Sequence, residues 1–162
     1  RGQIFRAMDF FHQNGARISF DPNIRPELLG DKSLDEVIGP VLSKCSVLFP
    51  GTLELELLTA RTDIQDAVRY LFDTGPFEII VVKKSKKGCT VYTSDQSIDI
   101  PAYEVDEVDP TGAGDCFDAG FLCGLLEKKP LQACGQMASA VGALNAGAFG
   151  PMEGKISPAT VQ

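Results

Sequence analysis

With 162 residues and a formal net charge of −7 at pH 7, the chain lacks the basic face that nucleic-acid binding requires. His12 is the only histidine and the five cysteines form no CxxC pair, which excludes a zinc site and a histidine-based catalytic triad. At 44% hydrophobic residues the chain can bury one core, so we expect a single domain over residues 1–162. We find no signal peptide and no apolar run that could cross a bilayer, and expect a cytoplasmic protein with reduced thiols and no membrane contact.

Helical and extended patterns alternate along the first half of the chain. Arg1-Gly2-Gln3 opens directly into a one-sided apolar stripe that ends at Asn14-Gly15, without initiator methionine or leader, so we expect the chain to be part of a longer protein. Capping boxes predict helix starts at Ser33 and at Thr62. We predict strands at 16–20, 46–49 and 78–83, and further helices at 33 to about 43, 53–58 and 62–74. This alternation favours a parallel sheet with right-handed crossovers.

The second half begins with a hairpin and ends in two helices. Strands are predicted at 89–93 and 97–102, split by the turn residues Ser94-Asp95-Gln96. The helix from 113 to about 126 is apolar nearly all round and should be buried. The next, from 131 to about 146, is rich in alanine and glycine and should pack closely. An α/β sheet of this kind binds ligands beyond the carboxyl ends of its strands.

The most informative motif is the run Asp109-Pro110-Thr111-Gly112-Ala113-Gly114-Asp115, which leads into the buried helix. Small residues let the backbone approach a ligand closely, and the N–H groups of a first helical turn attract an anion. A carboxylate beside such an anion hole can take a proton from an attacking hydroxyl, which indicates phosphoryl transfer. The alternative is a small-residue turn in which Asp115 only caps the helix.

The full motif, followed by a small-residue helix, resembles the C-terminal signature of the ribokinase (PfkB) family of carbohydrate kinases. The resemblance implies that Asp115 is the catalytic base and that Gly112, Ala113 and Gly114 form the anion hole. It also implies a ribokinase-like three-layer αβα fold with a mostly parallel sheet and a C-terminal β-hairpin. Family members are about twice as long, so the N-terminal half and the lid would be absent from this chain.

A second candidate segment is Asp21-Pro22-Asn23-Ile24-Arg25-Pro26, which follows a predicted strand. Arg25 can clamp phosphate or carboxylate oxygens in a bidentate way, or it is a solvated arginine in a turn. The segment resembles the family branch that acts on 2-keto-3-deoxygluconate, where this arginine lies near phosphates and substrate. Arg25 is therefore a candidate catalytic residue.

Several further residues are candidate nucleotide ligands through the same resemblance. Glu54 matches the glutamate of a family motif that organises magnesium and phosphates, although Gly51 stands where the family has asparagine; alone, Glu54 is an ordinary first-turn glutamate. The lysine-rich loop at 83–88 is a solvated hairpin entry by composition, but the matching loop passes along the nucleotide in the family. The candidates for nucleotide binding are Glu54, Lys83, Ser85, Lys87, Gly88, Gly114, Ser139 and Asn145.

Asp109 and Thr111 fall where some relatives bind a monovalent cation, and ordinary turn chemistry is the alternative. The function expected from the resemblance is transfer of a phosphoryl group from ATP to a sugar hydroxyl, with Mg²⁺ and, in some relatives, K⁺. A 2-keto-3-deoxy sugar acid is the preferred substrate, against fructose, ribose or a nucleoside. A non-catalytic nucleotide-binding or interaction fragment is the alternative. We also expect the full-length parent to be a homo-oligomer.

Overall fold

The strands and helices of the chain follow the predicted order. The computed structural model describes residues 2–161. Its strand order is β1-β2-β3-β4-β5, with β1, β2 and β3 paired in parallel. The helices are α1 (Gly2–Gln13), α2 (Leu34–Leu42), α3 (Thr52–Thr59), α4 (Ile64–Thr74), α5 (Ala113–Leu126), α6 (Leu131–Ala146) and α7 (Pro158–Val161). The strands are β1 (Ile18–Phe20), β2 (Cys45–Leu48), β3 (Ile79–Lys83), β4 (Cys89–Tyr92) and β5 (Ser97–Ile100), and two 3₁₀ turns are η1 (Pro26–Leu28) and η2 (Ser85–Lys87).

Local contacts divide the chain into two compact units. The first unit is Arg1–Val82 with Tyr92–Gln96, and the second unit is Lys83–Val91 with Ser97–Gln162. Each unit has its own packed interior. The expectation of one domain over residues 1–162 stays a prediction.

Large aliphatic and aromatic side chains fill the interior of the first unit. The helices α3 and α4 contribute Leu55 and Leu71, each at most 4% exposed. In the strands β2 and β3 neighbouring residues are buried, such as Val47 and Leu48 in β2. This pattern is expected for strands that are covered on both faces. The complete cluster is Cys45, Leu48, Leu55, Ala67, Val68, Leu71, Phe77, Ile80, Val82 and Tyr92.

The two predicted capping boxes differ in outcome. At α2 the Ser33 side chain accepts from the Glu36 N–H, and the Glu36 carboxylate accepts from the Ser33 N–H, so that prediction is confirmed. At α4 the N-cap is Asp63 rather than Thr62, and its carboxylate accepts from the Asp66 N–H at 2.8 Å. The prediction was wrong by one residue, because the acidic side chain at 63 reaches the third N–H of the helix.

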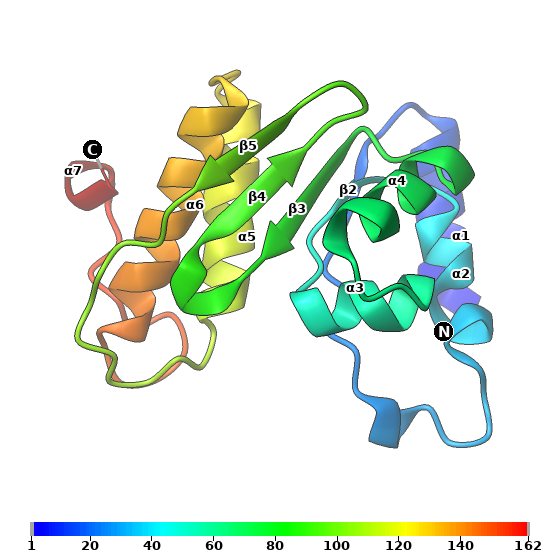
Figure 1. Cartoon of the computed structure of the whole chain (residues 1–162), viewed down its shortest axis with the longest axis horizontal. Coiled ribbons are helices and arrows are strands. Elements are labelled where there is room, and N and C mark those ends of the chain that lie inside the picture. Colours follow the sequence, from blue (N-terminus) through cyan, green and yellow to red (C-terminus); the bar gives the residue numbers. More distant parts are fainter. Residues whose placement is uncertain (1, 162) are drawn as a thin grey trace. The chain divides into compact units, whose positions relative to one another are not determined.

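The second unit consists of a hairpin that packs on a closely packed helix pair. In Figure 1, α5 and α6 lie side by side behind β4 and β5. Glycines allow the close approach: a Cβ on Gly120 would lie 3.0 Å from Cα of Ala138, and a Cβ on Gly124 would lie 3.0 Å from Cα of Cys134. The predicted close packing of the small residues is therefore confirmed. The prediction that α5 is buried holds for one side only, because Ala119, Cys123 and Leu126 are exposed.

Candidate functional site

A left-handed glycine begins α5. Gly112 is the N-cap residue with φ +78°, a conformation that glycine adopts without strain. The N–H groups of Gly114 and Asp115 have no acceptor among residues 2–161. Unpaired N–H groups in a first helical turn favour a bound anion. The turn therefore has the backbone geometry that the sequence motif predicts.

The carboxylate of Asp115 does not cap the helix. Asp115 is the third residue of α5 and is exposed. Its side chain makes no hydrogen bond or ion pair within the described residues, and no side-chain cap is present at Gly112. The capping alternative is therefore wrong for this side chain, and the carboxylate is accessible to a proton donor.

Side chains from the end of α6 and from the loop before α5 hold this turn in place. Asn145 Nδ2 donates to the Thr111 carbonyl at 2.8 Å. The two carboxylate oxygens of Asp109 accept from the N–H groups of Thr111 and Gly150, at 2.9 and 3.1 Å. Hydrogen bonds from the Thr111 hydroxyl and N–H, and from the Gly150 N–H, lower the pKa of Asp109 below its ordinary value. Asp109 therefore stays ionised and stabilises the loop.

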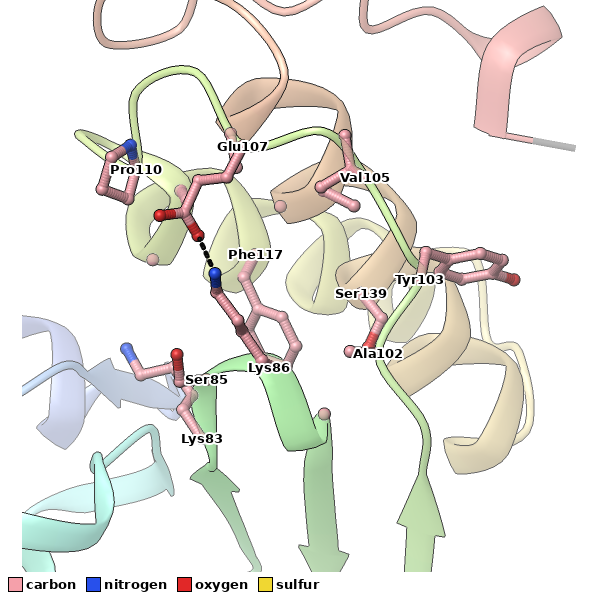
Figure 2. A pocket seen from close by; sticks show the side chains of 16 residues that line it. Lys83, Ser85, Lys86, Ala102, Tyr103, Val105, Glu107, Pro110, Phe117 and Ser139 are labelled. Atoms are coloured by element: carbon pink, nitrogen blue, oxygen red, sulfur yellow. Dashed lines mark ion pairs between the residues drawn. The ribbon is translucent and has the colours of Figure 1, made fainter.

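A cavity of about 320 Å³ lies beside the start of α5 in the second unit (Figure 2). Its volume falls in the range of about 300–1,000 Å³ that is common for small-molecule sites. One part is polar and carries Lys83, Ser85 and Gly114. The remainder is mostly apolar and includes Ala102, Val105, Phe117, Gly142, Ala143 and Ala146. The cavity thus combines a phosphate-compatible part with a surface for an apolar or flat group.

The lysine-rich loop forms one wall of the cavity. Gly88 has φ +82°, and a Cβ there would lie 2.0 Å from the Ile100 carbonyl oxygen, so only glycine fits. Ser85 has φ +52°, a conformation that is uncommon for residues other than glycine. Lys86 Nζ lies 3.3 Å from Glu107 Oε2, an ion pair visible in Figure 2. Lys87 does not line the cavity, and its role in nucleotide binding stays a prediction.

An ion pair that the sequence analysis missed lies next to the first turn of α5. Lys83 Nζ is 3.3 Å from Asp118 Oδ1, and both side chains are largely buried. The available signal was the spacing: Asp118 comes four residues after Gly114, which places both on one face of the helix. Because α5 is apolar nearly all round, a buried acid on it needed a partner, and the sequence alone could not name Lys83.

The structure brings part of the predicted site together. Lys83, Ser85, Gly88, Ala113, Gly114 and Ser139 line the cavity. Gly112 and Asn145 stabilise the turn beside it. Arg25 and Glu54 belong to the first unit. There, Glu54 accepts from the N–H groups of Ile24 and Gly51 at 2.8 and 2.7 Å, so it holds the loop that carries Arg25. Their roles at phosphates stay predictions.

Residues 2–161 contain neither a cluster of metal-binding side chains nor a membrane-spanning helix. Among residues 2–161 no group of three or more histidine, cysteine, aspartate or glutamate side chains is placed to hold a metal ion. In the same part of the chain no helix has the length and apolar character needed to span a membrane.

Comparisons with known proteins show the family of the chain. Residues 4–158 match the family model of the pfkB family carbohydrate kinases, so the chain belongs to this family. It is 32% identical to the 2-dehydro-3-deoxygluconokinase of Bacillus subtilis over 152 residues, covering 93% of the chain and 47% of that protein. It is 31% identical to fructokinase-1 of Oryza sativa over 156 residues, covering 90% of the chain and 48% of that protein.

The solved fructokinase of Vibrio cholerae O395, with fructose, ADP and calcium bound, superposes with a TM-score of 0.90 at 26% identity. The match covers 99% of this chain and 54% of that one. The predicted ribokinase-like α/β fold with a mostly parallel sheet is thereby confirmed, and so is the resemblance to the family. The chain spans about half the length of the curated relatives it matches.

Proposed function

We propose that this chain is the nucleotide-binding and catalytic part of an ATP-dependent carbohydrate kinase. The observation that carries the proposal is the start of α5, where an unpaired carboxylate follows two unpaired N–H groups beside a cavity. The cavity supports nucleotide binding because a lysine and a helix start suit phosphates, and the apolar part suits a base. Membership of the pfkB family supports the same reaction.

In the proposed mechanism the γ-phosphoryl group passes from ATP to a sugar hydroxyl and ADP leaves. Asp115 accepts the proton of the attacking hydroxyl, and its lack of a competing hydrogen bond supports this role. The N–H groups of Gly114 and Asp115 stabilise charge on the transferring group, and Gly112 and Ala113 shape the turn. Lys83 would add positive charge at the phosphates. The proposed role of Arg25 at phosphates rests only on the sequence of its own segment.

Metal ions would stabilise the negative charge of the nucleotide and hold the loop before α5. Mg²⁺ is usually held by nucleotide phosphates, water and few carboxylates, and it would neutralise phosphate charge. A monovalent cation such as K⁺ would lie at Asp109 and Thr111. The Oδ1 atom of Asn145 supports such a site, because it is buried without a hydrogen-bond partner in the described part of the chain.

A 2-keto-3-deoxy sugar acid is the proposed substrate. The Asp21–Arg25 segment supports it, since Arg25 is exposed and an arginine pairs well with a carboxylate. The Bacillus subtilis relative is named for such a sugar acid, whereas the Oryza sativa relative is named for fructose. Fructose, ribose and nucleosides are therefore the competing substrates.

The test has two parts. First, calorimetry of the 162-residue chain should detect ATP–Mg²⁺ binding that is weakened in Gly114→Val, because the added side chain enters the space beside Lys83. Second, in a kinase that joins this chain to an amino-terminal half like that of its relatives, Asp115→Asn should lower kcat by roughly 10²–10⁴ with little change in ATP affinity. Turnover close to wild type in Asp115→Asn would contradict the assignment of the base.

A panel of sugars tests the substrate. The joined kinase should phosphorylate 2-keto-3-deoxygluconate with a higher kcat/KM than fructose or ribose. We expect the chain alone to bind nucleotide without phosphorylating a sugar, because it spans about half the length of its relatives. Robust sugar phosphorylation by the chain alone would contradict that division.

A further inference from the structure

Asp118 holds the lysine at the polar part of the cavity. Lys83 Nζ lies 3.3 Å from Oδ1 and 3.4 Å from Oδ2 of Asp118. The two side chains are 19% and 13% exposed, whereas those of the nearby Lys84–Asp99 pair are 25% and 83% exposed. Removing one partner of a buried ion pair leaves an uncompensated charge, so each member fixes the other.

This pair places an ammonium group beside the start of α5. Asp118 follows Gly114 by four residues and lies on the same face, one turn further along the helix. The position that a Cβ would take on Gly114 is 3.8 Å from Lys83 Nζ. Lys83 and Gly114 also both line the cavity. The ammonium is therefore held next to the unpaired N–H groups of the first turn.

We infer that Asp118 is a positioning residue of the phosphate site: its carboxylate holds the Lys83 ammonium toward the phosphates that bind at the start of α5. The inference rests on the proposed function. The inference goes beyond the proposed function because it assigns a role to Asp118, an acid that takes no part in proton transfer. Lys83 then adds a point charge to the backbone N–H groups, which suits a group whose charge spreads over several oxygens.

Two effects of Asp118 oppose each other. A lysine side chain loses conformational entropy when it is held in one rotamer. Because Asp118 already holds Lys83 in the folded protein, this entropy is not lost again when ATP binds. Its negative charge, however, repels a bound phosphate. The inference requires that positioning outweighs repulsion, and binding measurements can separate the two.

The experiment is calorimetry of the 162-residue chain with ATP–Mg²⁺ and, separately, with adenosine as a probe that lacks phosphates. Asp118→Ala should weaken ATP binding about tenfold, as expected for loss of a charged hydrogen bond. Asp118→Asn should weaken it less, about threefold, because the amide oxygen can still accept from the ammonium. Adenosine binding should not change in either variant. Asp99→Asn is the matched control and should leave both affinities unchanged.

A double-mutant cycle completes the test. Lys83→Met should weaken ATP binding more than Asp118→Ala does, because it removes the ammonium itself. In the Lys83→Met background Asp118→Asn should cause no further loss, because only the repulsion by Asp118 is left to remove. Thermal melts check that each variant folds, and the nearly isosteric Asp118→Asn carries the comparison if Asp118→Ala does not fold.

Three results would overturn the inference. Tighter ATP binding in both Asp118 variants would show that repulsion outweighs positioning. An equal loss of adenosine affinity would show a purely structural role. A folded wild-type chain that binds no ATP would contradict the proposed function itself, and this inference with it.

Discussion

The two compact units of the chain build their interiors from different kinds of residue. In the first unit, Leu55 and Leu71 on α3 and α4 fill the core with large side chains. In the second unit, α5 and α6 meet through Gly120 and Gly124, where little more than backbone separates the helices. The first interior is stable because large side chains fill it. The second is close-packed because glycines, which have no side chain, let the two helices approach each other.

This difference accounts for where the site lies. Close packing of α6 on α5 extends to the first turn of α5, because a Cβ on Gly142 would lie 3.2 Å from the Ala113 carbonyl oxygen. The Asn145 side chain then reaches Thr111, and the unpaired N–H groups of Gly114 and Asp115 stay fixed next to the cavity. The proposed phosphate site is made of backbone groups and needs this kind of support.

The largest stability effect is expected from removing volume in the first unit. Leu55 is 1% exposed, so Leu55→Ala should lower the free energy of unfolding by about 2–5 kcal/mol through lost burial and a cavity. Denaturant titration measures it. Leu57→Ala on the same helix is the control, because Leu57 is 51% exposed and should cost much less. Equal losses would contradict the described core.

In the second unit, adding volume should destabilise the fold. A Cβ on Gly120 already lies 3.0 Å from Cα of Ala138 and 3.2 Å from Val141, so Gly120→Val forces the helices apart and should cost about 1–3 kcal/mol. Ala119→Val is the control on the exposed side of α5, where only the helix propensity of roughly 0.7 kcal/mol changes. Unchanged stability in Gly120→Val would remove the contrast between the two units.

A smaller effect tests the start of α4. Asp63→Ala should lower the free energy of unfolding by about 1 kcal/mol, because the Asp66 N–H loses its acceptor. Thr62→Ala should have little effect, since Thr62 is not the N-cap. A larger loss in Thr62→Ala than in Asp63→Ala would contradict Asp63 as the N-cap of α4.

The smallest effect is a pH dependence in the first unit. Burial raises the pKa of the Cys45 thiol from 9.0 to about 12. Between these values the unfolded chain releases a proton that the folded protein keeps, so stability falls as the pH rises. The fall from pH 8 to pH 10 should be about 1 kcal/mol larger in wild type than in Cys45→Ala. Cys123→Ala, at an exposed thiol, should keep the wild-type slope, and an equal slope in Cys45→Ala would contradict the shift.

The sequence by itself determined the features that depend on neighbouring residues. The capping box at Ser33, the hairpin around Ser94-Asp95-Gln96 and the small-residue helices are encoded within a few positions, and each is confirmed. The family also followed from a contiguous motif at residues 109–120, because its chemistry is local: a turn, an anion-binding helix start and an acid. The choice between Thr62 and Asp63 as N-cap failed, since both side chains can act as caps.

Only the tertiary structure decided which distant residues meet. Lys83 and Asp118 are 35 positions apart, and Asn145 and Thr111 are 34 apart, so neither pair has a local signal. The sequence also gives no sign that residues 102–105 line the cavity. These residues form an irregular loop, and such a loop lines a cavity only through its packing beside α6. Such pairings are set by how the helices and the hairpin pack, and packing depends on residues from the whole unit. That is why the motif predicted the family, whereas its supporting contacts emerged only from the fold.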